Sequence, residues 1–232
     1  MPLHSHHIDG DRALTTAMPH PRIWHGIGRQ LAHPTGWAGW LTGVLMGVVN
    51  RGPNAAMLAA LALSADDHVL DAGCGAGQLM AAMLKVARQV DGFDGSALMV
   101  QQASSRNALA MADGRCKLAL AHFSALPYAD NLFTRIAASN VIYFWQDIPA
   151  VVTEFQRVLR PGGRIVIYAT AAQSMATWRF AQTGTHRLFS PESFEKALRE
   201  AAGDRLAVSI RCITLKGGII GMVATLDDRP SA

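Results

Sequence analysis

The chain has 232 residues, of which 50% are hydrophobic and 16% are charged, so it can bury the core of a compact domain and is not disordered throughout. Its formal net charge is +4, and its 21 lysines and arginines are scattered along the sequence, which argues against a nucleic-acid reader. Three cysteines without paired spacing, and a start without an apolar leader, favour a reduced, cytoplasmic protein.

The N-terminal part differs in composition from the rest. We expect residues 1–20, which are polar and rich in histidine, to be disordered rather than to bind a metal. Residues 21–62 are expected to form short helices joined by turns. The apolar stretch 36–49 has fourteen residues, fewer than the ~20 that cross a bilayer as a helix. A helix or turn pair packed on the domain is favoured over a membrane span, and peripheral membrane contact stays open.

From residue 66 onward, short apolar runs alternate with helical periods, which is typical of a mainly parallel sheet with helices on its faces. The expected strands are 68–72, 89–93, 117–122, 135–139 and 164–170. The expected helices are 78–87, 97–111 and 148–159, preceded by one that starts near Pro53 and buries Met57, Leu58 and Leu61. Asp147 is the expected cap of helix 148–159, and Pro161 with the two glycines after it is expected to end that helix.

The C-terminal part predicts one more helix and a hairpin. Ser190, Pro191 and Glu192 place a cap, a first-turn proline and an early acid at the start of a helix. Two apolar strands, 206–215 and 219–225, are joined at Gly217 and Gly218, which permit the positive φ of a tight hairpin. The sheet is therefore expected to carry an antiparallel strand near one edge.

The strongest motif lies between the first expected strand and the helix after it. Asp71 ends the apolar run 68–72 and is followed by Gly73, Gly75 and Gly77. In a parallel sheet this turn faces the ligand, and glycines let the backbone pass close beneath it. A dinucleotide fingerprint would need a further glycine at the position that Gln78 occupies. The spacing therefore argues against a nicotinamide cofactor, although a tight strand–helix connection alone would also explain the turn.

A second motif follows the next strand. Asp94 lies 17 residues beyond Gly77, where a carboxylate can accept hydrogen bonds from both hydroxyls of a ribose. It could equally cap the helix that begins near Ser96. Asp91, two residues earlier, is expected at the surface.

Two further segments complete an ordered set, one from Ala125 to Asp147 and one from Arg157 to Tyr168. Taken in order, the four segments resemble the class I, Rossmann-like S-adenosylmethionine-dependent methyltransferases of the "type 11" group, whose relatives include quinone-biosynthesis C-methyltransferases. The resemblance covers about residues 60–200. It implies an α/β domain at 63–232 with a seven-stranded, mainly parallel, doubly wound sheet, an antiparallel C-terminal hairpin strand and the helical extension 21–62 as an acceptor-side lid.

The resemblance also implies which residues hold S-adenosylmethionine. The methionine moiety would be bordered by the first glycine turn and by the end of the fourth strand, at Asp71, Gly73, Cys74, Gly75 and the carbonyl of Asn140. The ribose and adenine would be held by the end of the second strand, the helix after it and the segment after the third strand, at Asp94, Gly95, Leu98, Met99, His122 and Phe123. The segment from Arg157 to Gly163 is structural in that family.

The chain departs from the family pattern at two positions. His122 stands where an Asp usually binds the adenine amino group, and Thr134 replaces an Asp after Phe133. Neutral imidazole has one acceptor nitrogen, so His122 could take over the adenine contact. It could instead point to solvent, while backbone near Phe123 holds the adenine, or serve the acceptor as a base. The change at Thr134 is expected to be structural.

The acceptor is expected to be a small, apolar or aromatic molecule that takes the methyl group on O, N or C. The segments 23–50 and 171–190 carry tryptophans that could line its pocket or belong to the core. The candidate bases are His25, Tyr143 and His186, each also explained by packing or exposure. No metal is expected. A non-catalytic cofactor-binding module and a nicotinamide-dependent oxidoreductase remain as alternatives.

Overall fold

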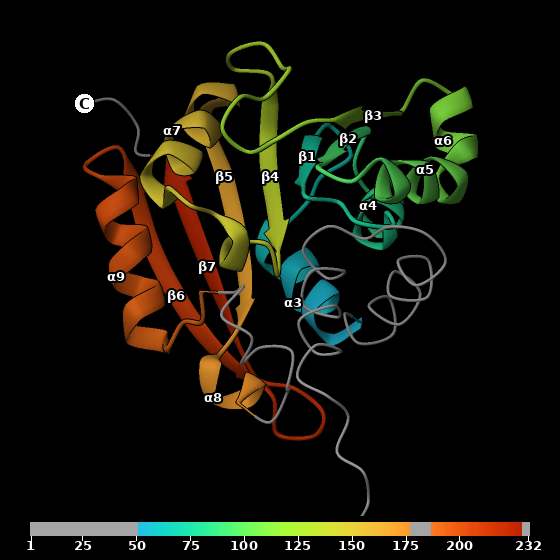
Figure 1. Ribbon diagram of the computed structural model, residues 1–232. Coiled ribbons are helices and arrows are strands. Elements are labelled where there is room, and N and C mark those ends of the chain that lie inside the picture. Colours follow the sequence, from blue (N-terminus) through green and yellow to red (C-terminus); the bar gives the residue numbers. More distant parts are fainter. Residues whose placement is uncertain (1–50, 177–186, 229–232) are drawn as a thin grey trace, which may run out of the picture.

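The computed structural model describes residues 51–176 and 187–228. Its sheet has seven strands in the order β3-β2-β1-β4-β5-β7-β6, and β7 runs antiparallel to both of its neighbours while the other pairs are parallel (Figure 1). The bounds are β1 His68–Ala72, β2 Gln89–Asp94, β3 Cys116–Leu120, β4 Phe133–Ser139, β5 Leu159–Thr170, β6 Leu206–Thr214 and β7 Ile220–Asp228. This sheet confirms the predicted fold class.

Helices cover both faces of the sheet, which makes the domain doubly wound (Figure 1). One face packs against α7 (Ile148–Val158) and α9 (Pro191–Ala202), and the other against α3 (Arg51–Leu61), α4 (Gln78–Met83) and α5 (Ala97–Arg106). The short elements are α6 (Ala108–Ala112), α8 (Ala172–Met175) and the 3-10 turn η1 (Ile142–Phe144). The buried apolar residues accordingly form two clusters, one on each face.

The helix starts and the hairpin follow the predicted local chemistry. Oδ1 of Asp147 accepts from the N–H of Ala150 at 3.0 Å, which caps α7. The hydroxyl of Ser190 accepts from the N–H of Ser193, and the hydroxyl of Ser193 accepts from the N–H of Ser190. Helix α9 therefore begins with a capping box. Gly217 and Gly218 both have positive φ between β6 and β7, as the tight hairpin requires.

Helix α3 packs directly on the sheet. Its Met57 and Leu61 are 0% exposed and lie in the cluster beneath α4, while Leu58 is half-buried, so the predicted stripe is confirmed. The stretches 1–20 and 21–50, with His25 and the apolar run 36–49, lie outside the described residues. Across 51–176 and 187–228, no helix is long and apolar enough to cross a membrane.

The predicted helix 97–111 is divided in two at Asn107. The side-chain amide of Asn107 donates to the carbonyls of Ala103 and Gly77, at 2.9 and 3.3 Å. Because such local side-chain bonds offer the backbone an alternative to helix, α5 ends at Arg106 and α6 restarts at Ala108. The same bonds fasten this point of the chain to the glycine turn.

The third strand is shorter at its end than predicted. It ends at Leu120, so His122 follows the strand and forms an isolated bridge with Ala125. The segment that leads from there to β4 packs on the α7 side of the sheet, where the Tyr128 hydroxyl donates to the carbonyl of Gly92 at 3.0 Å.

The expectation of an exposed Asp91 is wrong. Asp91 is 3% exposed, its Oδ2 lies 2.9 Å from Nε2 of His68, and its Oδ1 accepts from the N–H of Lys117 at 3.1 Å. A buried carboxylate needs such partners, and they come from the two strands on either side of β2.

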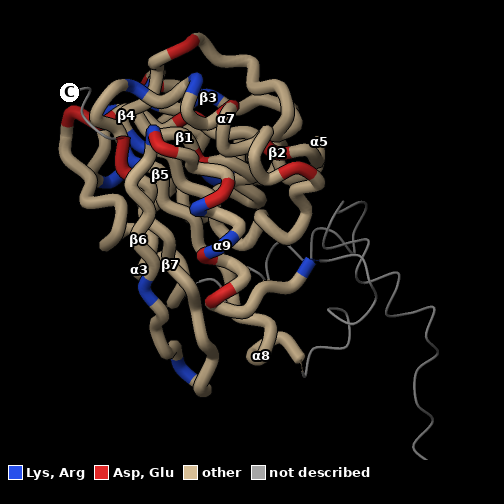
Figure 2. Tube along the Cα trace, turned by 90° about the vertical axis from the view of Figure 1, so that its left-hand side faces the viewer, with Lys and Arg blue, Asp and Glu red and all other residues tan. Residues whose placement is uncertain are grey.

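Charged residues of both signs are interspersed along the described chain (Figure 2). Several form ion pairs, such as Arg164 with Asp227 at 2.6 Å and Arg199 with Glu195 at 2.7 Å. Arg157 contacts both Asp130 and Glu154. An exposed pair such as Arg199 with Glu195 stabilises the fold little.

Candidate functional site

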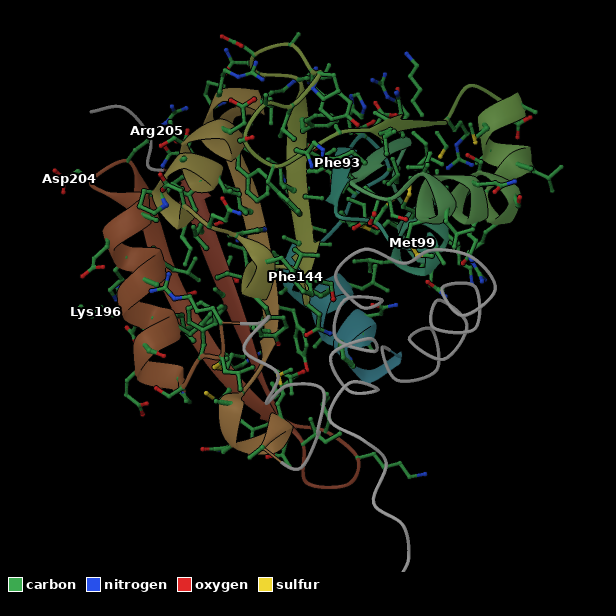
Figure 3. All side chains as sticks on the ribbon, in the orientation of Figure 1. Phe93, Met99, Phe144, Lys196, Asp204 and Arg205 are labelled. Carbon is green, nitrogen blue, oxygen red and sulfur yellow. The ribbon has the colours of Figure 1, made fainter. Side chains whose placement is uncertain are left out.

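The residues predicted to bind the cofactor lie at or just beyond the carboxyl ends of β1, β2, β3 and β4. Phe93, Met99 and Phe144, labelled in Figure 3, mark β2, α5 and η1 around this edge. In an open parallel sheet this is the edge where ligands bind. The residues there fall into a glycine turn, two carboxylates and a turn after β4.

The glycine turn after β1 uses its glycines for different reasons. All three have positive φ, +73° at Gly73, +51° at Gly75 and +76° at Gly77, which other residues rarely adopt. A Cβ on Gly73 would lie 2.7 Å from Cγ1 of Val141, and one on Gly77 would lie 2.6 Å from Nδ2 of Asn107. At Gly75 no described atom lies within 4 Å of that position. Among the described residues, therefore, nothing covers the backbone at Gly75.

Asp94 ties the two turns of the site together. Its Oδ2 accepts from the N–H of Gly75 at 3.0 Å, and its Oδ1 accepts from the N–H of Ser96 at 2.8 Å. Ser96 is itself the N-cap residue of α5, so Asp94 is not the helix cap. Each carboxylate oxygen can accept more than one hydrogen bond, and Asp94 is half-buried, so these contacts are compatible with binding a ligand as well.

Asp71 is a buried carboxylate with one unsatisfied oxygen. It is 2% exposed and accepts from the N–H of Met80 at the start of α4. Its Oδ2 has no hydrogen-bond partner within the described part of the chain. Burial, with the nearby charge of Asp94, raises the pKa of Asp71 to about 7. A cationic donor at this oxygen would remove the cost of leaving it buried and unpaired.

The turn after β4 is held by Tyr143. Asn140 has φ of +56°, and its Oδ1 accepts from the Tyr143 hydroxyl at 3.1 Å. The same hydroxyl accepts from the N–H of Thr170 at the end of β5. Tyr143 is 6% exposed, and burial raises the pKa of its hydroxyl above the ordinary value. This tyrosine is thus poorly suited to act as a base near neutral pH.

The residues predicted to border adenine lie around the end of β2. Met99 is buried and Leu98 is half-buried on α5. His122 is exposed, and a Cβ on Gly95 would lie 3.6 Å from its Nδ1. The ring of Phe123 packs on Phe93 at 5.0 Å between centroids, so its side chain belongs to the core.

Cys74 is buried and lies within the turn itself. The candidate base His186 lies outside the described residues, as do Trp178 and Phe180. Among the residues that are described, no group of three or more His, Cys, Asp or Glu side chains could hold a metal ion.

The second departure from the family pattern is structural, as predicted. The hydroxyl of Thr134 donates to Oδ1 of Asp67 at 2.6 Å, and it accepts from the N–H of His68 at 3.1 Å. These bonds fasten the start of β4 to the start of β1, at the edge opposite the site. Arg157 likewise donates to the carbonyls of Leu126 and Tyr128, in agreement with its expected structural role.

Known proteins resemble both the sequence and the fold. Residues 70–167 match the family model described as "Methyltransferase domain". The methyltransferase GfsG of Streptomyces halstedii is 38% identical over 108 residues, 46% of this chain and 39% of that protein. A demethylmenaquinone methyltransferase of Symbiobacterium thermophilum is 33% identical over 103 residues, 43% of this chain and 41% of that protein. The matched part of the chain thus spans less than half the length of these two relatives.

A solved structure agrees with the observed topology. The geranyl diphosphate C-methyltransferase of Streptomyces coelicolor, solved with geranyl diphosphate, Mg²⁺ and S-adenosyl-L-homocysteine, superposes with a TM-score of 0.62. Its identity is 18%, over 77% of this chain and 78% of that one, so the likeness concerns the fold. Together with the sequence matches it confirms the predicted resemblance: residues 70–167 resemble the Rossmann-like methyltransferases of the type 11 group.

Proposed function

We propose that the protein is an S-adenosylmethionine-dependent methyltransferase that acts on a small-molecule acceptor. The observation that carries this proposal is the pairing of a bare glycine turn at Gly75 with two carboxylates, Asp71 and Asp94, at the same edge of the sheet. The edge offers acceptors for a ligand with hydroxyl groups and positive charge, and S-adenosylmethionine carries both.

The residues present fit this cofactor. The buried, unsatisfied Oδ2 of Asp71 suits the ammonium group of the methionine moiety, which we place along Gly73, Cys74 and Gly75. Asp94 would accept from the ribose hydroxyls, and Asn140 would offer its carbonyl to the amino group. Leu98, Met99, Gly95, His122 and the backbone near Phe123 would border the adenine.

When bound, the cofactor supplies a methyl group attached to a sulfonium sulfur. The neutral thioether that remains after transfer is a good leaving group. The chain therefore has to hold an acceptor in line with that methyl group and to exclude water. Well-oriented proximity can lower a barrier by roughly 7–11 kcal/mol, so a dedicated base is required only if the acceptor must lose a proton. Tyr143 is better suited to holding the Asn140 turn than to that task.

We propose that residues 21–62 contribute to the acceptor side of the pocket, beside the domain 63–232. The relatives named above act, by their names, on a quinone precursor and on geranyl diphosphate. An apolar or aromatic acceptor agrees with the tryptophans of segment 21–62, and the methylated atom can be O, N or C. Three free cysteines without paired spacing support a cytoplasmic location.

The proposal is tested by a methyl-transfer assay. The protein is incubated with S-adenosylmethionine labelled on the methyl group and with a small-molecule extract, and labelled products are identified by mass spectrometry. We expect a labelled small molecule and one equivalent of S-adenosylhomocysteine. Binding of S-adenosylhomocysteine without any turnover would indicate a non-catalytic cofactor-binding module, and binding of NADH alone would indicate an oxidoreductase.

A further inference from the structure

The turn after β4 has a backbone conformation that needs support. Asn140 follows the last residue of β4 and has φ of +56°, in the left-handed region that favours glycine. Asparagine tolerates this region better than most residues, but such a conformation persists only where its surroundings hold it.

Tyr143 supplies that support through a single buried hydroxyl. The hydroxyl donates to Oδ1 of Asn140 or to the carbonyl of Thr170, each at 3.1 Å, and accepts from the N–H of Thr170. The Thr170 hydroxyl adds a longer contact of 3.4 Å to the same Oδ1. The backbone carbonyl of Tyr143 also accepts from the N–H of Arg187 at 3.2 Å. One residue thus joins the ends of β4 and β5 and the chain at Arg187.

The supported turn lies against the glycine turn of the site. A Cβ on Gly73 would lie 2.7 Å from Cγ1 of Val141, the residue next to Asn140. A change in the Asn140 turn therefore reaches the segment that we expect to border the methionine moiety, while the residues assigned to the adenine lie after β2, on α5 and beyond β3.

We infer that Tyr143 is a positioning residue: its hydroxyl holds Asn140, and through it the carbonyl that receives the amino group of the cofactor. The inference rests on the proposed function and assigns Tyr143 a different role from that of a catalytic base. Because Tyr143 acts on the amino-acid end of the ligand, its removal should affect ligands that carry this end and spare those that lack it.

The test compares two ligands by isothermal titration calorimetry. S-adenosylhomocysteine carries the amino-acid part, and 5′-methylthioadenosine carries the same nucleoside without it. We expect Tyr143→Phe to raise the Kd of S-adenosylhomocysteine about tenfold, the worth of roughly one hydrogen bond, and that of 5′-methylthioadenosine less than twofold. The matched control is Tyr168→Phe, since Tyr168 is also buried on β5 and contacts the Thr170 hydroxyl, at 3.5 Å, rather than Asn140. It should leave both Kd values within twofold of wild type.

A double-mutant cycle tests whether Tyr143 acts through Asn140. Asn140→Gly permits the positive φ without side-chain support, so adding Tyr143→Phe in that background should change the Kd of S-adenosylhomocysteine less than threefold. A tenfold change there, or an equal loss for both ligands in Tyr143→Phe, would overturn the inference. If Tyr143→Phe does not fold, Asn140→Ala decides, because it removes the same bond and must show the same selective loss. Wild-type protein that binds neither ligand would instead refute the proposed function.

Discussion

The carboxylate of Asp94 is held by two backbone N–H groups, from Gly75 and Ser96, so its position is fixed before any ligand binds. Asp94→Ala is expected to raise the Kd of S-adenosylmethionine by about 100-fold or more, since two charge-assisted hydrogen bonds to the ribose contribute roughly 1.5–3 kcal/mol each. Calorimetric titration measures this, and circular dichroism checks the fold. Asp113→Ala, at an exposed acid that follows α6, is the control and should bind as wild type. An unchanged Kd in folded Asp94→Ala would remove Asp94 from the site.

The buried carboxyl of Asp71 should make cofactor binding depend on pH. Because burial and the charge of Asp94 raise its pKa to about 7, the ligand-free protein holds a proton there below pH 7. A cationic ligand favours the ionised form, so binding must release that proton and weakens on acidification. The Kd of S-adenosylmethionine is expected to rise about tenfold from pH 8 to pH 6. In Asp71→Asn, which cannot ionise at this position, the Kd should lose this tenfold dependence on pH.

The same shift bears on folding stability. The Asp71 carboxyl ionises near its ordinary value of 3.8 when unfolded and near 7 when folded. Between these two values the folded state holds the extra proton, so the contribution of Asp71 to stability falls as the pH rises through this window. The free energy of unfolding of wild type, relative to that of Asp71→Asn, should therefore decrease from pH 4 to pH 7. A difference that stays constant over this range would contradict the raised pKa of Asp71.

His122 lies beside Gly95, where the family has an acid, and we predict that its neutral imidazole accepts from the adenine amino group. His122→Ala should then weaken binding of 5′-methylthioadenosine several-fold, about 1 kcal/mol. Calorimetric titration of both proteins with 5′-methylthioadenosine measures this loss. An equal Kd in wild type and in folded His122→Ala would show that His122 is not an adenine ligand, and a loss of turnover alone would identify a base.

At the scale of elements, the turn between β1 and α4 combines a backbone conformation that favours glycine with room for a ligand beside it. Gly75 and Gly114 both have positive φ, and at each of them a Cβ would have no described atom within 4 Å. Only Gly75 lies at the proposed site. Alanine at either should cost stability, about 1–2 kcal/mol. Only Gly75→Ala should also lose cofactor affinity, by tenfold or more, because its methyl group enters the ligand's space. Thermal unfolding and calorimetric titration of both variants measure the two effects; equal affinities would place the ligand elsewhere.

The order of elements could be predicted from the sequence because strand and helix periods, caps and glycine turns are local signals. The capping of α7 by Asp147 and the hairpin at Gly217 are examples. Contacts between distant residues leave no such signal. The bond from Asn107 to the carbonyl of Gly77 joins residues 30 positions apart, and the burial of Asp91 depends on His68, 23 residues away.

The functional site likewise combines local patterns, which the sequence reveals, with contacts between distant residues, which it does not. The motifs at Asp71, Gly73, Gly75 and Asp94 could be found because an acid and glycines next to a strand end form a local pattern. The role of Tyr143 could not, since its partner Thr170 lies on another strand, 27 residues later. The spacing of Tyr143 and Asn140, three residues apart at a strand end, was a weak signal that the two side chains could meet.

At the scale of the whole molecule, the described domain supplies the cofactor side of the proposed enzyme. Two apolar clusters lock α7 and α9 on one face of the sheet and α3, α4 and α5 on the other, which leaves the carboxyl edge to bind ligands. The proposed acceptor side draws on residues 23–50 and 171–190, which carry tryptophans and the candidate bases His25 and His186. This division predicts that cofactor binding does not require the acceptor.

The most direct test of the proposed function is isothermal titration calorimetry of the full chain with S-adenosylmethionine in the absence of any acceptor. We predict one binding site per chain for S-adenosylmethionine and no measurable heat with NADH under the same conditions. No binding of S-adenosylmethionine by folded protein at millimolar ligand, or saturable binding of NADH instead, would contradict the account.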